Sequence, residues 1–411
     1  MSRSILHKVV TVTAFAPLAL AAACGGGTKA ATAGGTGSSQ DIVLGASLSQ
    51  TGPLGSFGVN LDAGYQQRIS EVNAAGGLAV AGTKHHVTLT VLDNRSDPNT
   101  ATQQIRELVL KDHAVALLGA CTPPIVVPEA LAAEQQKVPI VSSCNPVMAF
   151  QAGDASGWKY SWDLFFNEKD QASQVTQVLA TSTGNKKVAL FTDSEPDGVA
   201  ERGLFKAAFA TAGLDVVGDY SFPVGTTDFS SFIADAKSKG ATLLAGQMIP
   251  PDGIALWKQM KALSFSPGIA YVAKASTGLA WPKALGATAE GTVTQGFWSP
   301  VNGEPGSAKL ETTLGAKYPG DFADLDIAVL GYTVVSIVTD GITAAGSTDP
   351  AKVNEAIGQT NAHYPLGSVT FGPNHTSTTP NILMQWQNGS IVQILPSVPG
   401  VTLQTPTKGL S

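Results

Sequence analysis

The chain has 411 residues, enough for two or three domains, an ordinary globular composition and a formal net charge of −6. This negative balance disfavours nucleic acid as a partner, because a polyanion calls for a basic surface. The sequence has no GxSxG or HExxH motif, and its six histidines show no metal-ligand spacing. We therefore expect no enzymatic activity, no cofactor and no metal site.

The N-terminal residues 1–23 have the pattern of a signal peptide. Basic residues precede an apolar run from Val9 to Ala23, which has the length of a signal-peptide core and is short for a membrane span. Small residues before Cys24 are typical of a lipoprotein signal, although a plain secretory signal cleaved nearby is the alternative. Residues 24–40 are rich in Gly, Ser and Thr and predict a flexible linker. We expect an exported protein with a lipid anchor at Cys24 in the cell membrane, on its extracytoplasmic side.

From residue 41 onward, short apolar strands alternate with amphipathic helices. The expected strands are 41–49, 85–93, 114–119 and 138–143, and the expected helices are 58–77, 99–112 and 126–136. This alternation predicts βαβ units and a parallel sheet. The same rhythm restarts near 187 and continues to 298, which predicts a second α/β unit.

The remaining chain completes the two units. Helices are expected within 305–345, where they have no sheet of their own and should flank the first lobe. No later segment reaches the roughly 20 apolar residues that a membrane span needs. The tail at 367–395 alternates apolar and polar residues around Asn388-Gly389, which predicts short antiparallel strands.

We therefore predict an α/β fold of two Rossmann-like lobes with parallel sheets, joined by a hinge of several strands. The first lobe is expected to contain residues 41–160 and 300–362, and the second lobe residues 161–299 and 363–411. Because ligands bind outside the carboxyl ends of the strands in open parallel sheets, the residues that follow strands are candidates for the site.

Two loops that follow strands share one pattern. Thr122 precedes Pro123, and Asn145 precedes Pro146. Each pair is typical of an N-cap residue followed by proline at the first helical position. The free N–H groups and positive dipole end of such a helix accept a carboxylate or phosphate, and the Ser143 hydroxyl adds a donor. Ordinary helix capping without a ligand is the alternative.

The same two loops hold Cys121 and Cys144, the cysteines that remain after Cys24. Export places them in an oxidising setting, where a disulfide is expected if the two strands are neighbours. Two buried free cysteines are the alternative, since Cys is also a common core residue.

Aromatic residues occupy two further candidate positions. Phe57, next to Ser56 in the glycine-rich loop 51–58, is expected to lie over the cleft, with a simple packing role as the alternative. Trp162 lies where the chain is expected to cross between lobes, and it either stacks on a ligand or packs the hinge.

The strings "IVLGASLSQTGPLGSFG", "VTLTVLDNRSDPNTATQQ" and "VPIVSSCNP" resemble the type I periplasmic binding proteins of ABC importers, in particular the leucine/isoleucine/valine-binding subgroup. The resemblance runs from about residue 41 to 400. It implies two lobes that close on a small solute and deliver it to an ABC permease and its ATPase.

Carried over by position, the resemblance implies carboxylate-binding groups at Cys121 to Pro123 and at Ser143 to Asn145. It implies contacts from the second lobe near three residues: Asp197, Met248 and Lys274.

One departure bears on the ligand. The amino-acid binders of this family hold the ligand ammonium with an acidic residue, but Lys274 and Ala275 stand in the matching stretch here. The sequence therefore favours a small organic anion, aromatic or branched-aliphatic, over an amino acid. A ligand-sensing domain for a signalling partner is the further alternative.

Overall fold

The computed structural model describes residues 41–317 and 325–411. The predicted signal peptide at 1–23, the linker at 24–40 and the lipidation site Cys24 lie outside the described residues. Within the described ranges, the strands form two large sheets and two small hairpins, β2 (Leu78–Val80) with β3 (Thr83–His85) and β13 (Asn361–Tyr364) with β14 (Gly367–Thr370).

The first sheet is parallel throughout. From edge to edge its strands are β4 (Val87–Asp93), β1 (Ile42–Leu48), β5 (Ala116–Leu118), β6 (Ile140–Ser143), β7 (Ser161–Phe165) and β15 (Thr376–Thr378). The run IVLGASL of β1 is buried along nearly its whole length, as a central strand covered on both faces requires. The strand order reverses between β1 and β5, which opens a crevice at their carboxyl ends.

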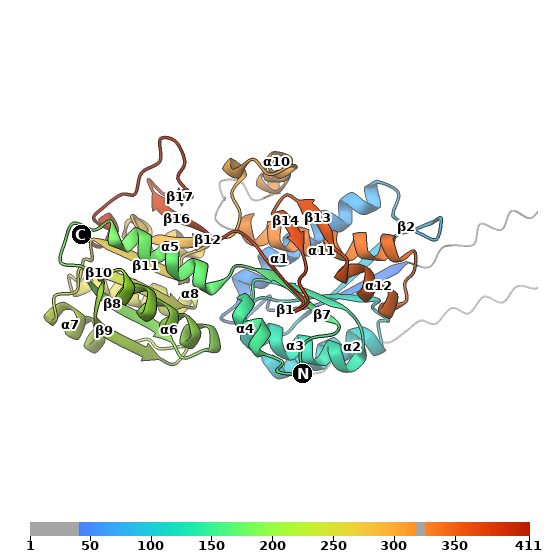
Figure 1. Ribbon diagram of the computed structural model, residues 1–411, viewed down its shortest axis with the longest axis horizontal. Coiled ribbons are helices and arrows are strands. Elements are labelled where there is room, and N and C mark those ends of the chain that lie inside the picture. The colour runs from blue at the N-terminus through green and yellow to red at the C-terminus, as the bar shows by residue number, and fades with distance from the viewer. Residues whose placement is uncertain (1–40, 318–324) are drawn as a thin grey trace, which may run out of the picture. The chain divides into compact units, whose positions relative to one another are not determined.

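Helices cover both faces of the first sheet (Figure 1). One face packs against α1 (Gly55–Ala74), α11 (Leu325–Ala345) and α12 (Pro350–Gly358), and the other against α2 (Pro98–Leu110), α3 (Pro123–Gln136) and α4 (Val147–Ala152). The prediction that the helices within 305–345 flank the first lobe is confirmed, since α10 (Ser307–Lys317) and α11 both contribute to its core.

Helix α11 corrects one expectation from the sequence. By length and composition it is apolar enough to cross a membrane, although no such segment was expected after the signal peptide. In the fold, 78% of its most apolar window is buried. The helix is apolar because it forms the centre of the first lobe's core.

Helices α1 and α11 approach each other closely because each carries a glycine at the crossing. A Cβ atom at Gly64 would overlap the carbonyl oxygen of Ala328, and one at Gly331 would crowd the carbonyl oxygen of Leu61.

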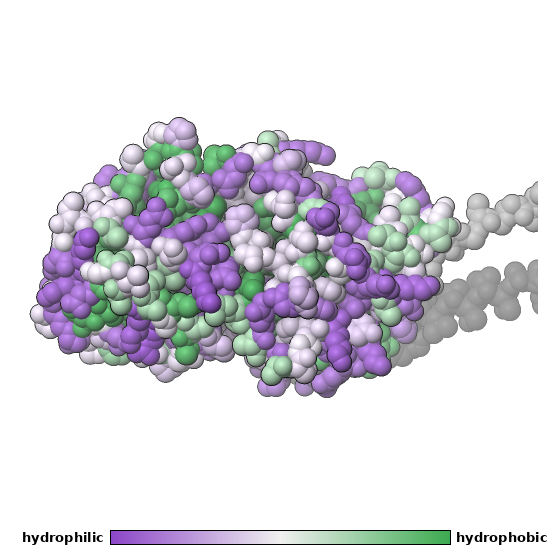
Figure 2. Space-filling view, viewed as in Figure 1, coloured by the Kyte–Doolittle hydropathy of each residue, from purple (hydrophilic) through white to green (hydrophobic). Residues whose placement is uncertain are grey.

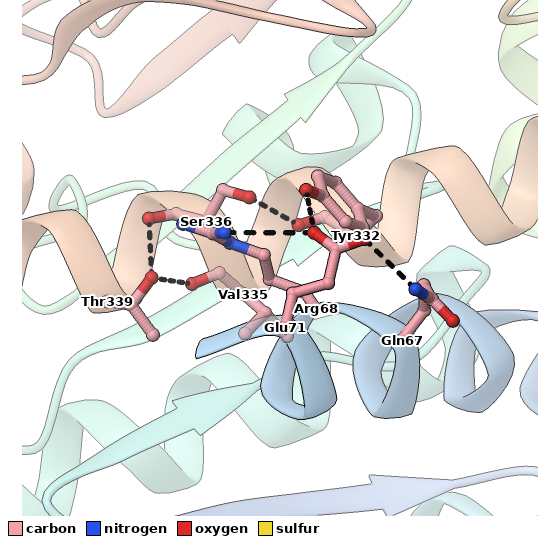
Figure 3. A network of polar contacts seen from close by, with 7 residues as sticks. All are labelled: Gln67, Arg68, Glu71, Tyr332, Val335, Ser336 and Thr339. Atoms are coloured by element: carbon pink, nitrogen blue, oxygen red, sulfur yellow. Dashed lines mark hydrogen bonds and ion pairs between the residues drawn. The ribbon is translucent and has the colours of Figure 1, made fainter. Parts of the chain in front are cut away.

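Polar contacts line the rim of this crossing (Figure 3). The Tyr332 hydroxyl donates to one carboxylate oxygen of Glu71 at 2.6 Å, and Gln67 Nε2 donates to the other at 3.0 Å. The Arg68 guanidinium lies 5.6 Å from the centre of the Tyr332 ring. These contacts tie α11 to α1, the first helix of the first lobe, across more than half of the chain.

The second sheet repeats the order of the first in its parallel part. Its strands are β9 (Asp215–Phe222), β8 (Lys187–Asp193), β10 (Leu243–Met248), β11 (Ile269–Lys274), β12 (Val293–Gly296), β16 (Ile382–Gln387) and β17 (Ser390–Leu395). Helices α5 (Glu168–Ala180) and α6 (Pro196–Thr211) cover one face, and α7 (Ser230–Ser238), α8 (Pro250–Ala262) and α9 (Ala280–Leu285) the other.

The predicted hairpin at the tail is confirmed. Strands β16 and β17 are antiparallel, and the turn residues Asn388 and Gly389 have φ of 56° and 78°. A two-residue hairpin turn with both φ values positive requires residues such as Asn and Gly.

The sheet order places the lobe boundaries differently from the prediction. Residues 161–165 form β7, which pairs with β6 in the first sheet, and residues 376–378 form β15, which pairs with β7. Tyr364, Val369 and Phe371 also pack in the first lobe's core. Alternation of apolar and polar residues predicts a strand but does not say which sheet the strand joins, so these segments were assigned to the wrong lobe.

Large apolar side chains reach the surface of the described residues singly. They are Val59, Leu110, Leu131, Val199, Leu263 and Val301. On the face drawn in Figure 2, hydrophilic and hydrophobic residues are interspersed. Scattered exposure of this kind is normal for a folded domain and marks no binding surface by itself.

Candidate functional site

A pocket lies at the carboxyl ends of strands from both sheets. Its lining residues are Phe57, Thr122, Pro123, Cys144, Pro146, Phe165, Phe166, Asp197, Glu201, Gln247, Lys274, Thr277, Gln295, Phe297 and Ile327. The cavity holds about 30 Å³, which is room for one or two water molecules. A solute as large as an amino acid therefore enters only when the surrounding groups move apart.

The side of the pocket formed by the first lobe and the lobe crossings is apolar. Phe165 and Phe297 lie with ring centres 4.4 Å apart, and Phe166 stacks on Phe297 at 5.8 Å. Phe57 and Ile327 complete this wall. Among these lining residues the polar group is the Thr122 hydroxyl, which is buried and has no hydrogen-bond partner.

The side formed by the second lobe is polar and charged. Lys274 Nζ lies 2.8 Å from Asp197 Oδ2, and Gln247 Nε2 donates to the same oxygen at 2.9 Å. Burial lowers the pKa of Lys274, but the charges of Asp197 and Asp193 outweigh burial, so its pKa lies above the ordinary value and the amine is charged. Lys274 is 7% exposed, so it does not point into solvent.

Further carboxyl groups surround this lysine. Burial raises the pKa of Asp193 to about 7, although the charge of Lys274 acts in the opposite direction. Burial and the charges of Asp197 and Glu168 raise the pKa of Glu201 well above its ordinary value. Burial therefore disfavours the charged form of Glu201, while the Lys274 ammonium provides the positive charge of this wall.

The two helix starts differ from the predicted anion site. Helix α3 begins at Pro123 with Thr122 as its N-cap, as predicted, but the Thr122 side chain makes no capping bond. The next two helical residues, Pro124 and then Ile125, offer no free donor, because proline has no N–H and the Ile125 N–H donates to the Thr122 carbonyl at 3.1 Å.

At the second loop the prediction is wrong on two counts. Helix α4 begins at Val147 with Pro146, not Asn145, as its N-cap. The N–H groups of Met148 and Ala149 each donate to the Glu168 carboxyl group at 3.0 Å. This helix start is bonded to a carboxyl group of the protein itself, so it is not free to receive a solute carboxylate.

The structure brings six of the predicted site residues together at the pocket: Phe57, Thr122, Pro123, Cys144, Asp197 and Lys274. Ser56 borders a smaller cavity that shares Phe57, Thr277 and Ile327 with the pocket. Ser143 and Asn145 are fully buried beside the lining loops and do not line the pocket, and their side-chain polar atoms have no partners.

Two predicted site residues lie elsewhere. The indole of Trp162 stacks on His375 at 3.7 Å and donates to Asn354 Oδ1 at 2.8 Å, so it packs within the first lobe. Met248 is fully buried in the core of the second lobe. Neither residue is a lining residue of the pocket.

Cys121 and Cys144 form a disulfide with their Cα atoms 4.9 Å apart. The bond joins the loop after β5 to the loop after β6, the pairing expected from neighbouring strands. Cys144 itself lines the pocket. The disulfide therefore belongs to the wall of the site.

Several lining residues were not predicted. Gln247 and Gln295 lie at the carboxyl ends of β10 and β12, so the strand-end rule that selected the loops of the first lobe could have identified them. Glu201 follows Asp197 by four residues on α6, a spacing that places both on one helix face. Ile327 and Phe297 carry no local signal, because their positions depend on the return of the chain to the first lobe.

Two lobes with parallel sheets of one order, and a pocket where their strand ends meet, define a solute-binding protein of the α/β class. The family model described as periplasmic binding protein matches residues 41–390, so the chain belongs to this family. Members of the family are substrate-binding proteins of transporters and are not enzymes.

Relatives cover nearly the whole chain at low identity. The Leu/Ile/Val-binding protein homolog 3 of Brucella melitensis is 24% identical over 360 residues, 86% of this chain and 93% of its own length. The leucine binding protein LivK of Thermotoga maritima has a structure with a TM-score of 0.77 at 23% identity, covering 86% of this chain and 97% of its own. A solute binding protein of R. palustris, solved with benzoate, has a TM-score of 0.74 at 17% identity, covering 86% and 95%.

Behind the pocket, the buried carboxyl of Glu129 supports the loop that carries Cys121. One of its oxygens accepts the Ala120 N–H at 2.9 Å. Burial raises the pKa of Glu129 from 4.5 to about 8, although the hydrogen bond from Ala120 acts in the opposite direction. Glu129 therefore holds a proton at neutral pH in the folded protein.

This pKa gives a prediction about stability. The folded protein holds the Glu129 proton more tightly than the unfolded chain, so stability falls as the pH rises from about 4.5 through about 8. Between pH 5 and pH 9 the loss is on the order of 4 kcal/mol. In Glu129→Gln, which keeps an oxygen for Ala120 and cannot ionise, we expect this loss to disappear.

Thermal or urea unfolding from pH 5 to pH 9 measures the effect. Glu107→Gln, on the exposed face of the preceding helix, serves as the control and should follow the wild-type profile. If Glu129→Gln and wild type lose stability in parallel across this range, the buried proton is not at Glu129.

Proposed function

We propose that the protein captures a small carboxylate-bearing solute in this pocket and delivers it to an ABC permease and its ATPase. The observation that carries the proposal is the pairing of an apolar wall with a polar wall that holds the buried, charged Lys274. Because the walls come from different lobes, a solute that contacts both favours the closed arrangement and shifts the population toward it.

The two walls support one orientation of the solute. Its apolar body, aromatic or branched-aliphatic, packs against Phe165, Phe166 and Phe297, and its carboxylate lies at the Lys274 ammonium. This differs from the expected position at the helix starts, where prolines, the Thr122 carbonyl and Glu168 leave no free main-chain N–H. The named relatives include a leucine-binding protein and a protein solved with benzoate, and both ligands combine a carboxylate with an apolar body.

An amino acid is the second candidate, and one observation favours it. Asp197 pairs with Lys274 through Oδ2, while Asp197 Oδ1 is buried without a partner. A solute ammonium beside Oδ1 and a carboxylate beside Lys274 would satisfy both groups.

Matched solutes distinguish the two candidates. We expect 4-methylpentanoate and 3-phenylpropanoate to raise the unfolding temperature more than leucine and phenylalanine, which differ from them by the α-ammonium group. A ligand that binds the folded state alone stabilises it by RT ln(1 + [L]/Kd), so a thermal-shift series measures the preference. Tighter binding of both amino acids would assign the site to the zwitterion, and binding of none of the four would contradict the proposed function.

Lys274 and Thr122 give a second test, of orientation. We expect Lys274→Met to weaken binding of the preferred acid by about 2–3 kcal/mol, as loss of a charged partner does, and Thr122→Val by less than about 1 kcal/mol. Isothermal titration measures both, after circular dichroism confirms folding. A larger loss from Thr122→Val than from Lys274→Met would place the carboxylate on the first lobe instead.

We also infer that the protein is exported and held at the extracytoplasmic face of the cell membrane by a lipid on Cys24. The small residues before Cys24 and the Gly/Ser/Thr-rich segment after it support this inference. Wild type should partition into the detergent phase and Cys24→Ala into the aqueous phase. Equal partitioning of the two would contradict the lipid anchor.

A sensing role beside a signalling partner is the alternative to transport.

A further inference from the structure

Two residues that line the pocket have backbone conformations that L-residues rarely adopt. Thr122 has φ of 73° and ψ of 141°, and Cys144 has φ of 67°. The Thr122 combination lies close to a region populated almost entirely by glycine. Such a conformation persists when neighbouring contacts impose it, and it is concentrated at ligand-binding and catalytic sites.

Two contacts join the loops of these residues to each other. The Cys121–Cys144 disulfide links the position before Thr122 to Cys144 itself, and the Thr122 N–H donates to the Cys144 carbonyl at 3.1 Å. Cys121, Thr122 and Cys144 are each less than 7% exposed, so water offers little competition for these contacts.

Polar side chains in these loops are buried without partners. Thr122 Oγ1, Ser143 Oγ and both polar atoms of the Asn145 amide make no hydrogen bond. Native proteins seldom leave buried polar groups unsatisfied, and those that remain call for an explanation such as a binding role. The same two loops therefore combine a rare backbone conformation with unused hydrogen-bonding capacity at the edge of the pocket.

We propose that the Cys121–Cys144 disulfide is a positioning element of the binding site. It holds the loops after β5 and β6 in a conformation that they leave when the bond is absent, and it thereby keeps Thr122 and Cys144 in place against the solute. This inference rests on the proposed function for its effect on affinity, but its effect on the loops can be measured without any solute.

The solute-free test compares glycine with alanine at position 122, in the oxidised protein and in Cys121→Ser/Cys144→Ser. Both substitutions remove the hydroxyl, and Gly alone tolerates the positive φ. We expect Thr122→Gly to unfold at a higher temperature than Thr122→Ala when the disulfide is present, and this difference to shrink or vanish when it is absent. Such a change is the coupling that a double-mutant cycle detects.

An equal Gly–Ala difference in both backgrounds would overturn the proposal, because the loop would then keep its conformation without the disulfide. If the disulfide-free chain fails to fold, the oxidised pair still decides. There, equal unfolding temperatures of Thr122→Gly and Thr122→Ala would show that the positive φ at 122 is not imposed.

The second measurement is affinity. For whichever of 4-methylpentanoate, 3-phenylpropanoate, leucine and phenylalanine binds the oxidised wild type, we expect Cys121→Ser/Cys144→Ser to bind at least about tenfold more weakly, since lost preorganisation reduces affinity. Unchanged affinity in a folded variant would show that the disulfide is a stability element alone. If none of the four binds wild type, the proposed function fails. The comparison at position 122 still tests whether the disulfide holds the loops in their conformation.

Discussion

The parallel arrangement of strands in both sheets is the constraint on which the site depends. Five neighbouring strands of each sheet run in one direction and in the same order, so their carboxyl ends lie along one edge. Each loop at that edge connects the end of a strand to the start of a helix, so it must provide for the main-chain polar groups of both. Many pocket residues come from this edge and either lie in a loop, as Thr122 does, or end a strand, as Lys274 does.

Burying a lysine at this edge sets the chemistry of the second wall. An unpaired ammonium would be costly away from water, and Asp197 offsets that cost at 2.8 Å. The neighbouring carboxyl groups of Asp193 and Glu201 are also buried, and burial raises their pKa values. The apolar wall needs no charged partner, because Phe165, Phe166 and Phe297 mainly need contact with other apolar groups. The division of the pocket into a charged wall and an apolar wall follows from where the lysine lies.

Much of this fold could be predicted from the sequence because its signals are local. Alternating apolar strands and amphipathic helices predict two parallel sheets, and Asn388-Gly389 predicts the tail hairpin; the structure confirms both. Within a strand, however, a shift of one residue changes the face of the sheet to which the side chain points. Gln247 lines the pocket while its neighbour Met248 packs in the core, since successive side chains point to opposite faces. The family resemblance selected Met248, which is one residue away from the side chain that lines the pocket.

Other features could not be predicted because their partners are distant in the chain. From the local sequence, Asn145 and Pro146 are expected to begin a helix with free N–H donors. The carboxyl group that accepts from the N–H groups of this helix start belongs to Glu168, on a helix of the other lobe. Trp162 reads as a residue at the lobe crossing, but its indole donates to Asn354, 192 residues away. In both cases a tertiary contact occupies a group that the local sequence pattern alone predicts to be available for a ligand.

The phenylalanines connect binding to the relative movement of the lobes. Phe165 ends β7 of the first sheet, after which the chain enters α5 of the second lobe. Phe297 follows β12 of the second sheet, after which the chain returns to α10 in the first lobe's core. The two rings meet at 4.4 Å, so side chains of two separate lobe crossings form one surface of the pocket. A solute that packs on this surface contacts the crossings themselves, and any rotation about them changes that contact. The fit of the solute's apolar body to this surface is therefore coupled to the closing of the lobes. Lys274, in contrast, interacts with the charge of the solute from the second lobe.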